Sequence, residues 1–394
     1  MINQKMYGLG SKRSIIREIF EYCKTRALEI GAENVFDFSI GNPSVEPPVE
    51  IKNAISELIT GDNALSLHSY TSAQGDLGVR TAIADHINLT NGVSVTPDDV
   101  YMTCGAAASL TITLKALFNS GDECIVFAPF FTEYRVFIEN ADGKVVVSTP
   151  ESKTFQIDVE DFESKISKST KAVIINSPNN PSGVVYTEET IKRVVEVLKQ
   201  KQEEYGHDIF LIADEPYREL VFDDIKVPYL MNYYDNTVVC YSYSKSLSLP
   251  GERIGYIAVN PKMAKNREVY YAVCGAGRSL GYVCAPSLFQ QVIKKSIGAK
   301  VDVGIYKENR DILYNALTEY GYECVKPDGA FYLFVKALED DATEFYKKAK
   351  QKEILLVPCD DFGVTGYVRI AYCVPKERIV KSLPYFKELA DEYR

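Results

Sequence analysis

The middle of the chain alternates short, nearly continuous apolar runs with stretches whose apolar residues recur at helical spacing. Strands that are apolar on both faces must lie in a sheet covered on both sides, and intervening helices favour parallel pairing. The expected strands are 101–103, 124–127, 145–148, 172–176, 209–213, 238–242 and 254–259, and the expected helices are 106–118, 131–139 and 187–204. We therefore predict an α/β fold with a mostly parallel sheet sandwiched by helices, in a large domain spanning residues 49–290.

The two ends of the chain have a different pattern. Helical spacing appears at 12–30, 287–300 and 342–352, whereas 329–335 and 366–373 are typical of strands. A chain of 394 residues is long for one ordinary core. We therefore predict that residues 1–48 and 291–394 together form a second, smaller α+β domain. A cleft between two domains is a preferred place for a small-molecule site.

Composition narrows the class of protein and its partners. No apolar run approaches the roughly 18 residues of a membrane span, so we expect no membrane partner. A formal charge of −10 without a basic block argues against nucleic acid as a partner. The nine cysteines show no CxxC pairing, so we expect free thiols and neither disulfides nor a metal site. The first residues lack a targeting pattern, which makes the cytoplasm the expected location.

Polar or small residues follow four of the expected strands at their carboxyl ends, where parallel α/β sheets bind ligands. Cys104–Ala108 opens a helix with small residues, whose free N–H groups suit a phosphate. Asn176–Gly183 is a turn that presents the amide of Asn180. Asp214 follows the third of these strands, and Lys245 follows the fourth. The sequence thus predicts that these groups meet at one edge of the sheet.

Each feature also has an ordinary structural explanation. The small residues fit a tight turn without a ligand, and the Asn- and Pro-rich segment fits a loop. Asp214 can cap a turn, and a lysine in an apolar run usually extends to the surface. The combination is more specific than its parts. Pyridoxal phosphate requires a lysine for the Schiff base, an acid to keep the pyridine nitrogen protonated, and a phosphate site.

The stretch 242–255, SYSKSLSLPGERIG, resembles the cofactor-lysine motif of the fold-type I, class I and II aminotransferases related to aspartate aminotransferase. Residues 176–183 and 213–217 are similar to two other cofactor motifs of that family, in the same order. The resemblance extends from Ser39 to Ile370. It implies pyridoxal-phosphate-dependent transfer of an amino group from an L-amino acid, such as aspartate, to a 2-oxo acid.

The resemblance also implies a role for each matching residue. Lys245 is expected to carry the cofactor and then move the substrate Cα proton, Asp214 to pair with the pyridinium, and Tyr217 to hydrogen-bond the phenolic oxygen. The other residues implied in cofactor binding are Gly105, Ala106, Ala107, Phe131, Asn180, Ser242, Arg253 and Tyr70. Tyr70 is expected to come from the partner subunit of a homodimer with shared active sites. The residues implied in substrate binding are Gly41, Asn180, Arg369 and Arg278.

Two positions bear on the substrate. Some aspartate-specific relatives have a lysine where this chain has Ala107, a departure that argues against aspartate. Arg278 is near the place where other relatives carry an arginine for a second substrate carboxylate, and its alternative is a surface position.

The alternative explanation for Phe131 is packing in the core, because aromatic residues dominate cores.

Three other functions share part of this pattern. A dehydrogenase would use Gly275-Ala276-Gly277 as a dinucleotide fingerprint, but Leu280 stands where the third glycine belongs. A non-catalytic cofactor-bound regulator would need a DNA-binding segment, and no basic helix-turn-helix precedes residue 40. A β-eliminating C–S lyase on the same scaffold would share every cofactor residue, so the motifs leave that alternative open.

Overall fold

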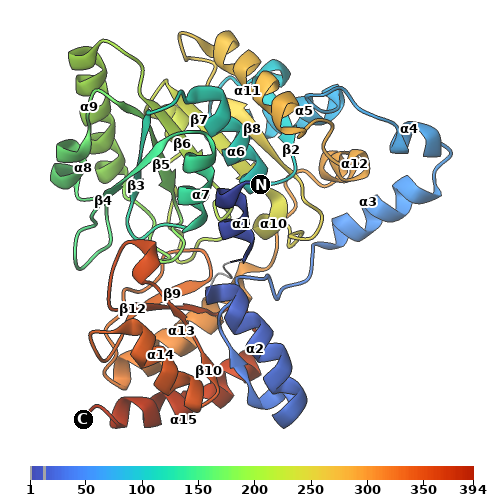
Figure 1. The fold of residues 1–394 in the computed structure, drawn as a ribbon. Helices are drawn as coiled ribbons and strands as arrows, with labels where there is room; N and C mark the ends of the chain where they lie inside the picture. The colour runs from blue at the N-terminus through green and yellow to red at the C-terminus, as the bar shows by residue number, and fades with distance from the viewer. Residues whose placement is uncertain (1, 12–14) are drawn as a thin grey trace.

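The computed structural model describes residues 2–11 and 15–394, which form two lobes (Figure 1). The upper lobe contains a seven-stranded sheet in the order β2-β8-β7-β6-β5-β3-β4. Its strands are β2 (Val100–Thr103), β3 (Glu123–Phe127), β4 (Lys144–Ser148), β5 (Thr170–Asn176), β6 (Phe210–Asp214), β7 (Thr237–Ser242) and β8 (Gly255–Val259). The strands from β7 to β4 pair in parallel, and β8 is antiparallel to both of its neighbours. The predicted α/β fold with a mostly parallel sheet is confirmed.

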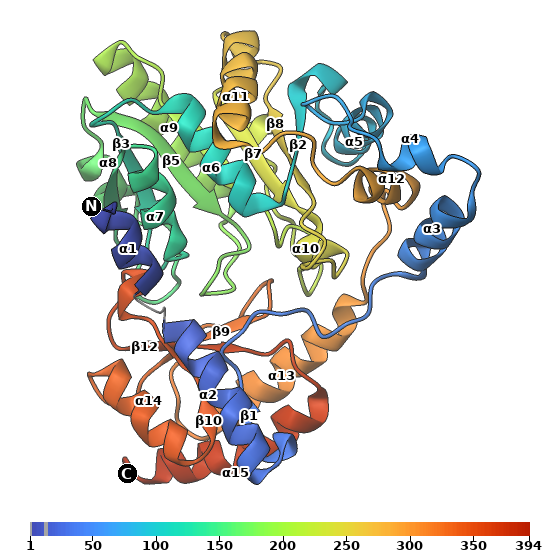
Figure 2. The same ribbon diagram turned by 45° about the vertical axis from the view of Figure 1, so that its right-hand side comes forward.

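Helices cover both faces of this sheet (Figure 2). The helices of the upper lobe are α3 (Val49–Thr60), α4 (Ala64–His68), α5 (Leu77–Asn91), α6 (Ala106–Leu117), α7 (Glu133–Asn140), α8 (Val159–Lys165), α9 (Glu188–Tyr205), α10 (Tyr243–Ser246), α11 (Asn266–Leu280) and α12 (Ser287–Lys295). Along β5, Val173 packs in the cluster that includes α5, α8 and α9, whereas Ile174 packs in the cluster that includes α6, α7 and α11. Burial on both faces explains why the strand sequences are continuously apolar.

Local signals define the helix ends. The side chain of Thr187 accepts a hydrogen bond from the backbone N–H of Thr190 at the start of α9, and Gly206 ends that helix with φ of 71°. Between them, Ile191, Val194 and Leu198 are buried at helical spacing. The cap, the apolar stripe and a glycine in the left-handed region are the features that make this segment a surface helix of the lobe.

The lower lobe combines residues from both ends of the chain. Its antiparallel sheet has the order β11-β12-β9, and a two-stranded parallel sheet joins β1 to β10. The strands are β1 (Phe36–Asp37), β9 (Tyr332–Lys336), β10 (Ile354–Leu355), β11 (Val357–Pro358) and β12 (Tyr367–Ala371), and the helices are α2 (Ile15–Ile30), α13 (Val303–Glu319), α14 (Ala342–Gln351) and α15 (Lys376–Asp391). Short 3-10 helices span Ala32–Asn34 and Asp360–Phe362 in this lobe, and Pro97–Asp99 and Leu230–Asn232 in the upper lobe. Phe36 and Phe38 share a buried core with residues of β9 to β12.

Two segments pack differently from the sequence-based assignment to the smaller domain. The helix expected at 287–300 is α12, whose Val292 and Ile293 lie in the core of the upper lobe, where the helix contacts α3. Helix α1 (Gln4–Ser11) lies beside α7, and the Lys5 amine donates to the Glu139 carbonyl at 3.1 Å. Residues 12–14 of the expected first helix are outside the described ranges. The division at 49 and 290 stays a proposal, and the packing of α12 favours a second boundary between α12 and α13.

Across residues 2–11 and 15–394, none of the helices combines the length and apolar character that crossing a bilayer requires.

Candidate active site

The carboxyl ends of β5, β6 and β7 bring the predicted polar residues together. Asn176 is opposite Asp214 in the register of β5 and β6, and Asp214 is opposite Cys240 in β7. The Asn176 side-chain amide donates to the Asp214 carbonyl at 2.9 Å, and its oxygen accepts from the backbone N–H of Asn180 at 2.8 Å. The turn at 176–183 is therefore fixed to the strand that carries the acid.

Lys245 lies on α10, the single helical turn that follows β7. Ser242 caps this turn by accepting from the Ser244 backbone N–H. The Lys245 ammonium donates to the Gly41 carbonyl at 2.6 Å and lies 5.4 Å from the centre of the Phe331 ring. Burial lowers the pKa of Lys245 to about 8, and the positive charges of Arg253 and Arg369 act in the same direction. A lysine with a lowered pKa is a better nucleophile and base near neutral pH.

Asp214 ends β6 in a buried position. The hydroxyl of Tyr134, on α7, donates to Oδ2 of Asp214 at 2.5 Å. Its other oxygen, Oδ1, is buried and has no hydrogen-bond partner among the described residues. Burial raises the pKa of Asp214 to about 7, and the hydrogen bond from Tyr134 opposes that rise. A buried carboxylate oxygen without a donor fits a ligand that brings a protonated nitrogen.

A cradle of backbone and side-chain donors lies at the start of α6. Gly105 caps this helix with φ of 90°, and a Cβ there would come within 2.8 Å of Nη2 of Arg253. The Arg253 guanidinium donates to the Cys104 carbonyl at 3.2 Å, and Ser242 and Ser244 share a hydrogen bond of 2.7 Å. Ala106 is half-buried and Ala107 is exposed. A helix N-terminus beside an arginine and a hydroxyl is suited to a phosphate.

Arg369 reaches this region from β12 in the lower lobe and is only 3% exposed. Its guanidinium donates to the side-chain oxygen of Asn180 at 3.1 Å and to the Ser39 carbonyl at 2.6 Å. Nε of Arg369 is buried without a partner among the described residues. The contact with Asn180 joins the two lobes. Arg369, which has an unused N–H donor, therefore lies beside the turn at 176–183 of the upper lobe.

Tyr217 lies in the turn after β6 and is buried. Its hydroxyl shares a hydrogen bond of 2.9 Å with the hydroxyl of Tyr332, on β9. The Tyr332 ring lies under the Arg369 guanidinium, 4.6 Å from its centre. A Cβ at Gly41 would come within 1.9 Å of the Tyr332 hydroxyl, so the Gly41 backbone lies directly against Tyr332 and leaves no room for a side chain.

Three residues predicted for the site have weaker links to the site residues described so far. Phe131 is half-buried, and its ring makes an edge contact with Tyr134 at 5.7 Å between centroids. Tyr70 is 95% exposed in this single chain. Arg278 is exposed in the last turn of α11, where its side chain has neither a hydrogen bond nor an ion pair within the described ranges. Their functional roles stay predictions.

Sequence reasoning missed two residues that hold the site together. Tyr134 follows Phe131 by three positions at the start of a helix, and that spacing could have placed both on one face. Tyr332 was inside an expected strand, but its contact with Tyr217 joins residues 115 positions apart. No local pattern indicates such a contact.

Comparison with known proteins gives the same class as this geometry. The family model described as aminotransferase class I and II matches residues 33–383. An aspartate aminotransferase of Thermotoga maritima is 32% identical over 91% of this chain and 92% of its own length. A probable aspartate aminotransferase of Methanocaldococcus jannaschii is 30% identical over 96% and 97%, respectively. The crystal structure of an amino transferase from Eubacterium rectale has a TM-score of 0.98 and 55% identity, and the match covers 100% of this chain and 99% of that one.

The chain belongs to the class I and II aminotransferase family. It is an enzyme, and it depends on pyridoxal phosphate, as the family does. The residues present fit this cofactor: the partnerless Oδ1 of Asp214 suits a protonated ring nitrogen, the start of α6 suits a phosphate, and Lys245 is a half-buried amine of lowered pKa.

Proposed function

We propose that Lys245 is the covalent attachment point and proton carrier of this aminotransferase, in a transfer between an L-amino acid and a 2-oxo acid. The observation that carries this proposal is the pairing of a half-buried amine of lowered pKa with a buried, half-satisfied carboxylate at adjacent strand ends. Groups with strongly perturbed pKa values that meet in one place are typical of catalytic sites.

Bound pyridoxal phosphate supplies a ring that accepts electrons from the substrate α-carbon. Asp214 accepts a hydrogen bond at Oδ1 and, when ionised, keeps the proton on the nitrogen that donates it. Lys245 Nζ takes the proton from the substrate α-carbon and returns it at the other end of the transfer. Arg369 fixes the substrate α-carboxylate, since a guanidinium presents several donors in a planar arrangement. Asn180 keeps Arg369 in place through their hydrogen bond.

The proposed cofactor-binding set is Gly105, Ala106, Ala107, Phe131, Asn180, Asp214, Tyr217, Ser242, Lys245 and Arg253. The backbone of the first three and the side chains of Ser242 and Arg253 surround the phosphate cradle described above. Tyr217 reaches the phenolic oxygen in this proposal, because its buried hydroxyl follows Asp214 in the turn after β6 and is hydrogen-bonded to Tyr332, which packs against Arg369. Phe131 serves as the ring that packs on the cofactor.

We propose a dicarboxylic amino acid such as aspartate as the preferred donor. The support is that two relatives carry the name aspartate aminotransferase or its probable form. Because Ala107 replaces the lysine that some aspartate-specific relatives have, this proposal requires another cation, and Arg278 is the candidate for the second carboxylate. Because it is exposed on α11 and does not meet Arg369 within the chain, it serves this role only if it reaches the site of a second subunit.

In the test, the enzyme receives one amino acid at a time together with 2-oxoglutarate. The amounts of keto acid formed and of ammonia released are then compared. We expect keto acid without ammonia, fastest with aspartate, and no activity in Lys245→Ala. Ammonia as the main product would identify the lyase alternative. Arg278→Ala should lower turnover of aspartate by two to three orders of magnitude while alanine turnover barely changes, since a desolvated charge pair typically contributes about 2–5 kcal/mol. Equal loss for both substrates would assign Arg278 a structural role.

We also propose a homodimer with shared active sites, in which Tyr70 acts in the partner's site. The support is its 95% exposure on a segment of the upper lobe, far from burial in its own chain. Mixing inactive Lys245→Ala and inactive Tyr70→Ala chains should restore part of the activity, because one site of the mixed dimer is complete. No recovery despite demonstrated subunit exchange would contradict sharing.

A cytoplasmic location completes the proposal. Its support is the nine free cysteines, four of which are buried. Fractionation of cells that produce the protein should find it with soluble cytoplasmic markers, and recovery with secreted protein would contradict this location.

A further inference from the structure

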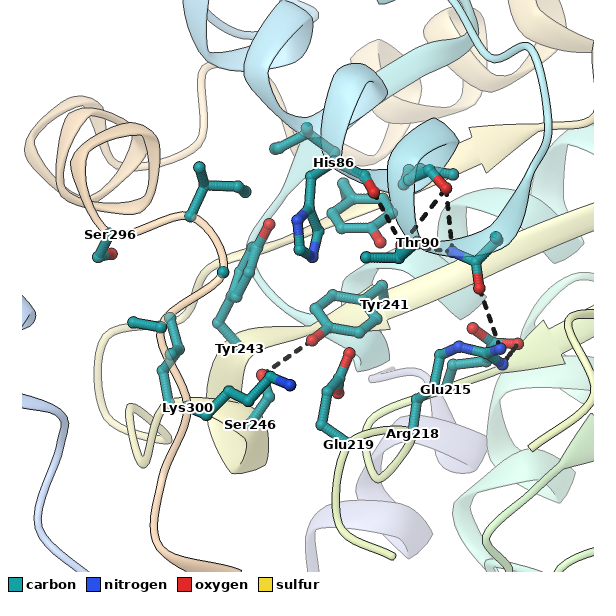
Figure 3. Close-up of a pocket in the computed structure, with 18 of the residues that line it drawn as sticks. His86, Thr90, Glu215, Arg218, Glu219, Tyr241, Tyr243, Ser246, Ser296 and Lys300 are labelled. Atoms are coloured by element: carbon teal, nitrogen blue, oxygen red, sulfur yellow. Dashed lines mark hydrogen bonds and ion pairs between the residues drawn. The ribbon is translucent and has the colours of Figure 1, made fainter. Parts of the chain in front are cut away.

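A second cavity lies next to the active site but is lined by none of the residues proposed for it. It has a volume of about 230 Å³ and is bounded by α5, the turn after β6, α10 and the segment 296–300 (Figure 3). Glu215 and Ser246 line it, and they directly follow Asp214 and Lys245 in the chain. At roughly 30 Å³ per water molecule, the space corresponds to about seven or eight waters, which is ample for a small metabolite.

Three tyrosines form one wall of this cavity. The rings of Tyr241 and Tyr256 stack with centroids 4.8 Å apart, and Tyr243 meets Tyr241 edge-on at 5.1 Å. The Tyr241 hydroxyl donates to Ser246 at 2.9 Å. Tyr243 and Tyr256 are each only 7% exposed, yet their hydroxyls have no hydrogen-bond partner among the described residues. Both residues line the cavity, so their hydroxyls are available to hydrogen-bond a ligand or water there.

Further unused polar groups lie along the same cavity. Oε2 of Glu215 and the Tyr229 hydroxyl are buried and unsatisfied in the part of the chain that the structure describes. The ring of His86 points toward Tyr241 from α5. Burial and the charge of Lys300 lower the pKa of His86, which favours the neutral imidazole, a form that can both donate and accept hydrogen bonds.

The charges around the cavity limit what it can bind. Glu215 is paired with Arg218 at 3.1 Å, so their charges compensate each other. Glu219 and Lys300 also line the cavity, and neither has an ion-pair partner within 2–11 and 15–394. Desolvation raises the pKa of the Glu219 carboxyl and outweighs the opposing effects of the Arg218 and Lys300 charges and of a hydrogen bond with Tyr241, so a further cation in the cavity would favour its charged form. A purely anionic ligand would leave Glu219 unmatched, and a purely cationic one would leave Lys300 unmatched.

We propose that this cavity is a second binding site for a free, zwitterionic amino acid, separate from the catalytic site. Its ammonium group faces Glu219 and the tyrosine rings, its carboxylate faces Lys300, and the free hydroxyls of Tyr243 and Tyr256 take up the remaining hydrogen bonds. The proposal does not depend on the substrate proposed above, because binding in this cavity requires no chemistry.

The test separates the two sites by substitution. Holoenzyme carrying Arg369→Ala, which weakens binding at the catalytic site, is titrated calorimetrically with each of the 20 standard L-amino acids up to about 10 mM. We expect at least one to bind saturably with a Kd below about 1 mM. Adding Glu219→Gln or Lys300→Gln should weaken that binding at least tenfold, as loss of one charge pair of about 1.4 kcal/mol requires. Glu189→Gln and Lys199→Gln, exposed on α9, are the matched controls and should change nothing.

Three results would overturn the proposal. The first is no saturable binding by any amino acid. The second is binding that neither cavity substitution weakens, which would place the ligand elsewhere. The third is equally tight binding of acetate or methylamine, which would show that only one charge is recognised. Cofactor absorbance and the thermal unfolding midpoint verify folding, and if Glu219→Gln fails to fold, Tyr243→Phe provides the second variant and should also weaken binding. Wild-type transaminase activity is measured apart, so the two proposals can fail independently.

Discussion

The rate at which the cofactor-free protein captures pyridoxal phosphate should rise with pH and level off above about pH 8. Only the neutral amine of Lys245 attacks the aldehyde, and burial lowers the pKa of this amine from 10.5 to about 8. At pH 7, roughly one-tenth of such an amine is neutral, against roughly 0.03% for a lysine of ordinary pKa. Capture at pH 7 should therefore be about 300-fold faster than an unperturbed lysine would allow.

The measurement is stopped-flow absorbance of covalent capture between pH 6 and 10. The rate should grow nearly tenfold between pH 6 and 7 and change little above pH 8.5. Pyridoxine 5′-phosphate, which has no aldehyde, serves as the control for pH effects on non-covalent binding, and Lys245→Ala should lose the covalent phase altogether. A rate that keeps climbing tenfold per pH unit to pH 10 would show that the environment of Lys245 does not lower its pKa, and the reasoning from burial would be wrong.

The remaining predictions concern single side chains around the same site. Asp214→Asn should lower kcat by roughly two to four orders of magnitude, since an unmatched buried charge costs about 3–5 kcal/mol, and steady-state rates near wild type would show that another acid does this work. Tyr134→Phe should weaken cofactor affinity by 10- to 100-fold, because a hydrogen bond to a charged group contributes about 1.5–3 kcal/mol, and equilibrium dialysis of the cofactor measures it. An unchanged affinity would reduce Tyr134 to a packing residue. Gly41→Ala should raise KM for every amino acid and lower stability by about 1–3 kcal/mol, as the added methyl meets Tyr332. Thermal unfolding and kinetics check both effects, and a selective loss for one substrate would contradict a role at the shared carboxylate.

The central sheet could be predicted closely from the sequence. The expected strand at 172–176 is β5 from Thr170 to Asn176, and the expected helix at 187–204 is α9 from Glu188 to Tyr205. These elements are defined by local signals, because their apolar residues repeat with a clear period and caps mark their ends. Asp214 and Lys245 could be placed near each other for the same reason, since the carboxyl ends of parallel strands share one edge.

Contacts between distant segments could not be predicted in this way. The hydrogen bond from Tyr134 to Asp214 joins residues 80 positions apart and depends on how α7 packs on the sheet. Helix α1 has no buried residue, so its sequence does not indicate which lobe it follows. The cavity beside Tyr243 is bounded by six separate parts of the chain, at 83–91, 215–219, 229, 241–247, 256 and 296–300, and only their packing creates it.

The hydrogen bond between Lys245 and the Gly41 carbonyl has a consequence for how the enzyme can change. The groups proposed to hold the cofactor lie almost entirely on loops of the seven-stranded sheet, whereas Arg369 and Gly41 belong to the lower lobe and the segment that connects it. Substitutions in the lower lobe can therefore alter which amino acid is accepted without rebuilding the cofactor cradle. The Lys245–Gly41 and Arg369–Asn180 bonds mark where this independence ends, because each ties one half to the other. Variation in specificity within this architecture is thus expected to accumulate around these two bonds and to leave the bonds themselves in place.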